Sequence, residues 1–257
     1  MSRILKTQIK DYTKEMDINF FCILRQFINM EMMNNIINKV NYFNEKYPYD
    51  EGKNPYITND KRKINSLYSD FGFEKERMKN WPEEKREGML DKYYDVRKEM
   101  GKELNILLSS IFYLLKKRQW KLTGITSFDV YPGCSEQEIH MDMPGILSKD
   151  LTRYYVSIPL HETKKNMGPI IYYKEPIMKE FRKIHNYNKN DQDDEGIIGH
   201  LNSLKWDIKQ IFLNAREQSE YKLGDISIHR DISFHNGGTN NSNKIRRFLF
   251  VVCDVRN

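Results

Sequence analysis

Two short patterns in the chain pair a histidine with an aspartate two residues later: His140-Met141-Asp142 and His229-Arg230-Asp231. In a β-strand, residues i and i+2 project to the same face, so such a pair can direct two metal ligands at one point. A further histidine, His235, would complete the two-histidine, one-carboxylate donor set that is typical of non-haem Fe(II). A single His-x-Asp pattern arises easily by chance, and the pattern alone does not choose between the two pairs.

Two arginines follow His235, at Arg246 and Arg247. A guanidinium can bind a carboxylate through two parallel hydrogen bonds, so either arginine could hold a carboxylate-bearing co-substrate near the metal. Buried without an anion, such an arginine would be costly. The alternative is a surface arginine on an edge strand.

The surrounding motifs resemble those of a known family. From Gly224 the chain reads as a Gly-Asp turn, a strand ending at His235, a Gly- and Asn-rich turn, and the arginine pair. Together with the first His-x-Asp pair, this order resembles the phytanoyl-CoA dioxygenase-like family of Fe(II)/2-oxoglutarate-dependent oxygenases. The matching segments are His140–Asp142, Tyr154–Leu160, Asn166–Pro169, Gly224-Asp225, His235, Asn240–Ser242 and Arg246. The spacings from Gly224 to His235 and from His235 to Arg246 are both eleven, as in the family, and the resemblance covers about residues 120 to 257.

The resemblance implies a complete site. His140, Asp142 and His235 would be the iron ligands and the catalytic centre, and Arg246 would bind the distal (C5) carboxylate of 2-oxoglutarate, with Arg247 as the alternative. The implied cofactors are Fe(II), 2-oxoglutarate and O2, and the implied reaction is hydroxylation of a substrate with release of succinate and CO2. Related halogenases have a small residue in place of the carboxylate, so Asp142 favours hydroxylation over halogenation.

The chain also departs from the family pattern. Gly237 stands where many members have a serine, and Met141 stands where many have a polar residue. His229 occupies a position that is usually bulky and is left out of the predicted metal set. Three residues are weak candidates for contacts to the keto-acid end of 2-oxoglutarate: Tyr131, Tyr155 and Asn240. The remaining histidines, His161, His185 and His200, have no informative spacing and are expected on loops.

The elements that must position these residues change character near residue 120. Before it, apolar residues from Phe20 to Ile37 recur at helical spacing, and one helix is predicted over 82–99 with a second reaching Lys117. After it, short β-rich runs dominate: Ile125–Tyr131, Arg153–Leu160, Ile170–Tyr173, Asp225–Ile228 and Phe248–Val255. An insertion at about 174–220 carries the acidic stretch Asn186–Glu195, a candidate loop over the site.

This order of elements predicts an α+β fold. We expect a single oxygenase domain over residues 1–257, with a mainly helical support region at 1–119. Residues 120–257 would form a jelly-roll (double-stranded β-helix) core, an architecture that suits short strands around a metal site.

Composition limits the possible partners. Charged residues make up 30% of the 257 residues and mean hydropathy is −0.75, while the net charge of +6 permits nucleic-acid binding without requiring it. The cysteines Cys22, Cys134 and Cys253 are unpaired by spacing, which favours free thiols in a reducing compartment. The amino terminus lacks the apolar core of a signal peptide, and the longest apolar run, Leu104–Leu115, is too short for a membrane span. We therefore expect a cytoplasmic enzyme with a small-molecule substrate.

Three alternatives stay open at this level. The chain could be an oxygenase or demethylase acting on nucleic acid or protein side chains. It could be a non-catalytic family member that serves as a binding module, or a metal enzyme that does not use 2-oxoglutarate, although the last would give no reason for the arginine. The sequence does not indicate the substrate or the oligomeric state.

Overall fold

The computed structural model describes residues 12–47, 61–69, 79, 82–142, 151–174, 177, 197–199 and 201–256. The helices with both ends in the described residues are α2 (Met30–Lys46), α4 (Glu83–Leu114) and α6 (Trp206–Ala215), with two 3-10 turns, η1 (Lys165–Met167) and η2 (Leu201–Ser203). Residues 12–19 are also helical. The strands are β1 (Phe21–Leu24), β2 (Arg62–Ser69), β3 (Trp120–Val130), β4 (Ile139–His140), β5 (Leu151–Pro159), β6 (Ile170–Tyr173), β7 (Ile197–Gly199), β8 (Arg216–Gln218), β9 (Ile226–Arg230), β10 (His235–Gly237) and β11 (Arg246–Arg256).

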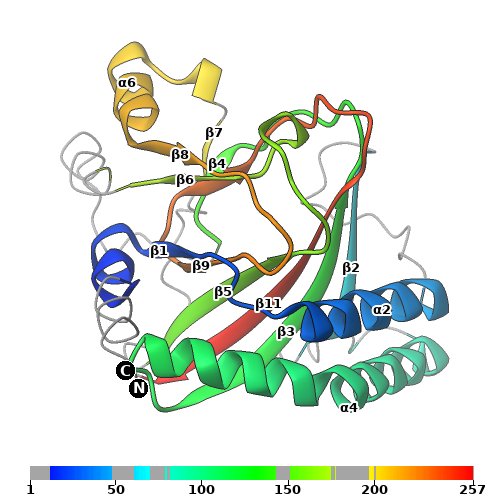
Figure 1. Ribbon diagram of the computed structural model, residues 1–257. Helices are drawn as coiled ribbons and strands as arrows, with labels where there is room; N and C mark the ends of the chain where they lie inside the picture. The colour runs from blue at the N-terminus through cyan, green and yellow to red at the C-terminus, as the bar shows by residue number, and fades with distance from the viewer. Residues whose placement is uncertain are drawn as a thin grey trace.

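These strands form two antiparallel sheets (Figure 1). The six-stranded sheet has the order β1-β9-β5-β11-β3-β2, and the five-stranded sheet has the order β7-β4-β10-β6-β8. From β3 onward the chain passes repeatedly from one sheet to the other, so strands far apart in sequence become neighbours, such as β4 and β10. The predicted α+β class with antiparallel sheets is confirmed.

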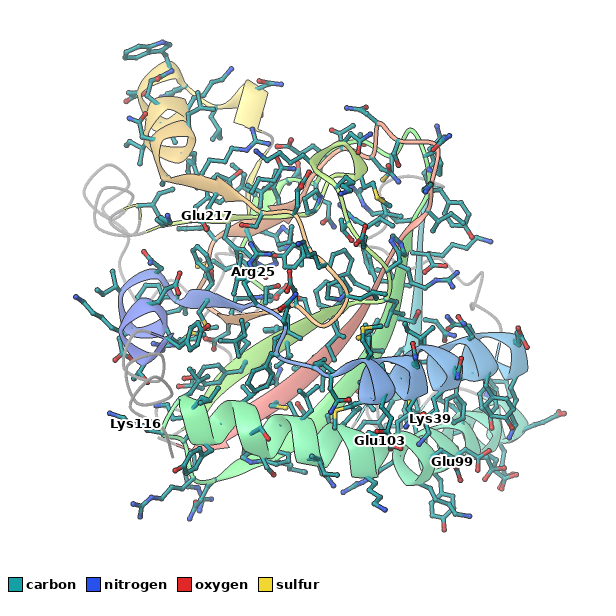
Figure 2. The ribbon with its side chains drawn as sticks, viewed as in Figure 1. Arg25, Lys39, Glu99, Glu103, Lys116 and Glu217 are labelled. Carbon is teal, nitrogen blue, oxygen red and sulfur yellow. The ribbon has the colours of Figure 1, made fainter. Side chains whose placement is uncertain are left out.

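Two helices support the six-stranded sheet on the side away from the other sheet (Figure 1). Buried side chains of α2 and α4 share one apolar cluster with strands of that sheet, including Val40, Phe43, Leu108, Ile125 and Val251. Lys39 of α2 pairs with Glu103 of α4, with Nζ and Oε1 2.7 Å apart, and also donates to the carbonyl oxygen of Glu99 (Figure 2). Burial of this cluster is the main force that holds the helical layer on the sheet.

A second apolar cluster lies between the five-stranded sheet and α6. It contains Ile139 and Met141, which are 0% and 4% exposed, together with Phe212 and Phe234. Because side chains alternate along an extended segment, burial of residues 139 and 141 on this side turns His140 and Asp142 toward the other. The orientation predicted for this segment is therefore observed; Met143 lies outside the described residues.

The N-terminal half differs from the prediction in three places. One continuous helix, α4 (Glu83–Leu114), stands in place of the two helices predicted over 82–117, and Gly101 lies inside it without ending it. Phe21–Leu24 forms a strand, β1, which pairs with β9, and is not part of a helix. Within the region predicted to be mainly helical, β2 is also a strand and pairs with β3. In β1, pairing with a distant strand overrides the local helical pattern.

The C-terminal half follows the prediction more closely. The five predicted runs correspond to β3, β5, β6, β9 and β11, and β3 and β11 are longer than expected. The predicted insertion at 174–220 contributes β7 and β8 to the five-stranded sheet. The acidic stretch 186–195 and the histidines at 185 and 200 lie outside the described residues. Within the described parts of the chain, no helix has the length and apolar character to cross a membrane.

Candidate metal centre and arginine site

Three predicted ligands meet where β4 and β10 pair. His235 lies directly opposite His140 in the antiparallel ladder, and their ring centroids are 4.5 Å apart. Asp142 follows β4, and its Oδ1 lies 3.8 Å from His140 Nε2 and 3.6 Å from His235 Nε2. One ligand atom from each residue lies within 4.8 Å of the others, which is close enough for a single metal ion to contact all three.

Both histidines of this cluster have their ring orientation fixed by the backbone. His140 Nδ1 lies 2.7 Å from the carbonyl oxygen of Glu138, and His235 Nδ1 lies 3.0 Å from that of Ser233. A carbonyl oxygen only accepts, so each Nδ1 carries the hydrogen and donates it. In a neutral ring, Nε2 then keeps its lone pair and points it toward Asp142, which is the arrangement found in metal-ligating histidines.

Burial and mutual charge set the protonation states of the cluster. Burial lowers the pKa of His140, and the charge of His235 lowers it further. Burial likewise lowers the pKa of His235. For Asp142, burial alone would raise the pKa, but His235 and a hydrogen bond from His229 outweigh it and hold the pKa well below its ordinary value. Neutral imidazoles beside an ionised carboxylate are the states that a divalent metal requires.

His229 contacts this cluster without being part of its ligand set. It is fully buried on β9, and its Nε2 lies 2.9 Å from Asp142 Oδ2. Since a carboxylate only accepts, Nε2 carries the hydrogen. The ring stacks on Tyr155, with centroids 5.0 Å apart, and Nδ1 lies 3.2 Å from the hydroxyl oxygen of Tyr172. His229 therefore holds one oxygen of Asp142 and leaves the other facing the two histidines, a contact that the sequence analysis did not predict.

The aspartate of the second His-x-Asp pair forms a local hydrogen bond in the turn after β9. Asp231 follows β9, and its Oδ1 accepts a hydrogen bond from the Ile232 amide at 3.0 Å. It is not among the residues grouped as a possible metal site in the described parts of the chain. In this pair the histidine therefore contacts Asp142, whereas the aspartate accepts a hydrogen bond within its own turn.

Arg246 is a buried cation without a carboxylate partner among the described residues. It is 2% exposed; its Nη1 lies 3.4 Å from the carbonyl oxygens of Met167 and Gly238, and its Nε has no hydrogen-bond partner. Burial, followed by the charge of Arg62, lowers the pKa of Arg246 to about 9. A bound carboxylate would offset this cost.

Arg247 is occupied elsewhere. Its guanidinium binds Asp129 through two hydrogen bonds of 2.7 and 2.8 Å, and its backbone amide donates to His161 Nε2. Of the two arginines, Arg246 is therefore the one that faces the interior. The spacing from His235 predicted Arg246, and the contacts of Arg247 agree with that choice; carboxylate binding by Arg246 stays a prediction.

Strand β10 connects the histidine cluster with Arg246. Gly237 lies two residues after His235, on the same face of the strand. A Cβ on Gly237 would lie 2.5 Å from Gln137 Oε1 and 3.2 Å from Arg246 Nη2. The Gly237 amide also donates to Gln137 Oε1 at 2.9 Å. The buried guanidinium of Arg246 therefore lies close to the strand that carries His235.

The candidates for the keto-acid end have other contacts. Asn240 Nδ2 donates to the carbonyl oxygens of Val130 and Lys244, and its Oδ1 accepts from Ser242, so both polar atoms shape the turn before β11. Tyr155 stacks on His229. A contact between Tyr131 or Tyr155 and a co-substrate stays a prediction.

No protein-family model and no curated protein matches the sequence. Solved structures match the fold. The non-heme alpha ketoglutarate dependent carbocyclase SnoK from nogalamycin biosynthesis superposes with a TM-score of 0.64 at 12% identity, over 96% of this chain and 84% of its own. The epimerase SnoN, solved with Fe3+, alpha ketoglutarate and nogalamycin RO, has a TM-score of 0.63 at 8% identity, with 96% and 84% covered. HygX from Streptomyces hygroscopicus, solved with nickel, 2-oxoglutarate and hygromycin B, has a TM-score of 0.54 at 9% identity, with 98% and 87% covered.

At these identities the likeness shows the fold alone. It is a fold that enzymes dependent on non-haem iron and 2-oxoglutarate have. Fe(II) and 2-oxoglutarate, expected from the sequence, are consistent with the His140–Asp142–His235 donor set and with the ligands in these solved structures.

Proposed function

We propose that this protein is an Fe(II)- and 2-oxoglutarate-dependent dioxygenase of the phytanoyl-CoA dioxygenase-like type. It would hydroxylate a small molecule and release succinate and CO2. The observation that carries this proposal is the convergence of His140, Asp142 and His235 beside Arg246, a buried arginine with an unpaired Nε. A metal site with a nearby carboxylate anchor suits a co-substrate that chelates metal at one end and carries a carboxylate at the other.

The strand order supports the finer fold assignment. The segment from β3 to β11 supplies the neighbouring strands β9-β5-β11-β3 of the six-stranded sheet and all five strands of the other. The chain crosses between the sheets at each step except from β6 through β8. We infer that this segment is a jelly-roll (double-stranded β-helix) core within a single domain. The segment before β3 adds β1 and β2 at the sheet edges and the helical layer.

Each residue of the site has a distinct task. His140, Asp142 and His235 would hold the iron, and iron with 2-oxoglutarate supplies the oxidative chemistry. The backbone carbonyls of residues 138 and 233 fix the two imidazoles, and His229 orients Asp142 through its second oxygen. Arg246 would bind the distal carboxylate of 2-oxoglutarate and so set the direction in which its keto acid meets the metal.

A small-molecule substrate is favoured by the solved structures of this fold. SnoN was solved with nogalamycin RO and HygX with hygromycin B, both small molecules. SnoN is described as an epimerase and SnoK as a carbocyclase, so the fold alone does not set the outcome of the reaction. Hydroxylation and a cytoplasmic location therefore remain proposals, as do the alternatives of a nucleic-acid or protein substrate and of a non-catalytic binding module.

The test is co-substrate turnover by the purified protein. With Fe(II), ascorbate and 2-oxoglutarate, slow release of succinate is expected even without a prime substrate. Arg246→Met should weaken 2-oxoglutarate binding by roughly tenfold or more, since a charge-assisted hydrogen-bonded pair contributes about 1.5–3 kcal/mol. Arg247→Met is the matched control, because that arginine is paired with Asp129. Absence of any 2-oxoglutarate binding to the metal-loaded wild-type protein would refute the proposal.

A further inference from the structure

A second buried arginine, Arg62, lies two strands away from Arg246 in the six-stranded sheet. Arg62 of β2 and Arg246 of β11 are both aligned with Val130 of β3, on its two sides. Residues directly opposite one another in antiparallel strands project to the same face. Adjacent strands lie about 4.8 Å apart, so the two arginines start about 10 Å apart and their long side chains can reach a common point.

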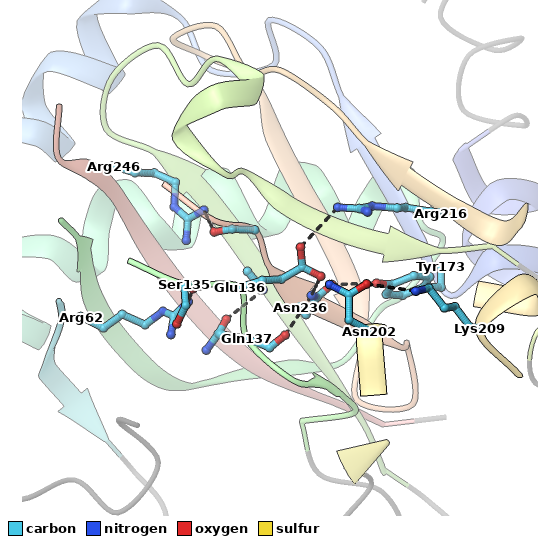
Figure 3. A network of polar contacts seen from close by, with 12 residues as sticks. Arg62, Ser135, Glu136, Gln137, Tyr173, Asn202, Lys209, Arg216, Asn236 and Arg246 are labelled. Carbon is cyan, nitrogen blue, oxygen red and sulfur yellow. Dashed lines mark hydrogen bonds and ion pairs between the residues drawn. The ribbon is translucent and has the colours of Figure 1, made fainter. Parts of the chain in front are cut away.

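Neither arginine has a carboxylate partner in the described parts of the chain. Arg62 is 5% exposed and Arg246 is 2% exposed, and the Nε atoms of both are buried without a hydrogen-bond partner. The contact made by Arg62 is a hydrogen bond from Nη2 to the carbonyl oxygen of Ser135, in the segment that leads to Gln137 (Figure 3). Burial lowers the pKa of both arginines, and the charge of Arg62 lowers the pKa of Arg246 further.

Two buried like charges close to each other are unfavourable unless an anion lies between them. Arginines that serve only the fold are usually paired, as Arg153 is with Asp254 and Arg247 with Asp129. Arg62 and Arg246 differ from these arginines, because both have a buried Nε without a hydrogen-bond partner and both are aligned with Val130. A single carboxylate bound by both guanidiniums would offset both desolvation costs.

We infer that Arg62 is a second anion-binding residue of the co-substrate pocket and that it clamps the distal carboxylate of 2-oxoglutarate together with Arg246. This inference rests on the proposed function. Its site extends from β11 across β3 to β2, so the edge strand of the N-terminal half contributes directly to co-substrate binding. The alternative is that Arg62 only holds the segment at Ser135.

A truncated co-substrate separates these two roles. We would measure the affinities of the Mn(II)-loaded wild-type and Arg62→Met proteins for 2-oxoglutarate and for 2-oxopentanoate, which has the same keto acid but no distal carboxylate. Arg62→Met should weaken 2-oxoglutarate at least about tenfold, the loss expected for one charge-assisted pair, and leave 2-oxopentanoate unchanged. Arg62→Lys keeps the charge without the bidentate geometry and should give a smaller loss, again confined to 2-oxoglutarate. Arg247→Met is the control and should change neither affinity.

Unchanged 2-oxoglutarate affinity in Arg62→Met would overturn the inference. So would equal weakening of both ligands, which would assign Arg62 to holding the loop. If Arg62→Met does not fold by circular dichroism, Arg62→Lys decides by the same ratio. Failure of the wild-type protein to bind either keto acid would instead refute the proposed function itself.

Discussion

The two His-x-Asp pairs have the same spacing, but their side chains make different contacts. In the first, His140 and Asp142 leave β4 toward a shared point with His235. In the second, His229 lies inside the other sheet between β1 and β5, and its partner Asp231 turns to its own loop. His229 still contacts the candidate metal site, because its Nε2 donates a hydrogen bond to Asp142.

The difference shows that the facing strand decides what such a pair does. His140 is placed for the proposed metal role because the ladder places His235 opposite to it. His229 gains a supporting role because β9 faces Asp142 across the gap between the sheets, with Tyr155 stacked against its ring. In the proposed site, His140 and Asp142 of the first pair would be ligands, whereas His229 of the second pair would orient the ligand Asp142. Four changes would break or sharpen this distinction.

The largest effect is expected for His140→Ala. It removes a ligand, so Mn(II) or Fe(II) affinity should fall by more than about 100-fold, given that outer partners alone are worth roughly 10–100-fold. Calorimetry or equilibrium dialysis would measure this. His161→Ala is the control, because His161 contacts the Arg247 amide away from the cluster. If His229→Ala abolishes metal binding while His140→Ala does not, the ligand set is wrong.

A smaller effect is expected for His229→Phe. The ring still packs against Tyr155, but the hydrogen bond to Asp142 Oδ2 is lost. Metal affinity should fall by roughly 10–100-fold, the usual range for an outer partner. The melting temperature should be recorded in parallel to separate this loss from unfolding. Wild-type metal affinity in this variant would remove His229 from the site.

The pH dependence of metal binding should reflect the buried histidines. Protons compete with the metal only below the pKa of the ligating rings, and burial lowers the pKa of His140 and His235 from 6.5. Mn(II) affinity measured from about pH 5 to about pH 8 should therefore hold through pH 6.5 and fall only below it. Half-loss above pH 6.5 would contradict the environment described for these rings.

The smallest effect is expected for Asp231→Asn. The amide oxygen can still accept from the Ile232 amide, so stability should change by about 1 kcal/mol or less. Metal affinity should stay at the wild-type value, as titration of the purified variant would show. A loss comparable with that of His140→Ala would mean that the second pair is the true ligand source.

Features that depend on a few neighbouring residues could be predicted from the sequence. The strands β6 and β11 follow from short runs of β-branched and aromatic residues, and burial of Met141 follows from alternation beside His140. The meeting of the three predicted ligands could also be predicted, because the order of the motifs resembles that of a family whose fold brings such residues together. Their role in metal binding stays a prediction.

Contacts between distant strands could not be predicted from the sequence. The pairing of β1 with β9 and of β2 with β3 has no local signal, and helical spacing near Phe20 pointed the other way. The contact of His229 with Asp142 and the alignment of Arg62 with Arg246 both depend on register across the sheets. The features that most distinguish this site therefore arise from tertiary pairing.

The most direct test of the central claim is the visible charge-transfer band that forms when 2-oxoglutarate chelates Fe(II), recorded without oxygen. The wild-type protein and Asp231→Asn should both show the band, and His140→Ala should lack it. A wild-type protein that shows no band and binds no 2-oxoglutarate by calorimetry would contradict the assignment of His140, Asp142 and His235 as an iron site next to Arg246.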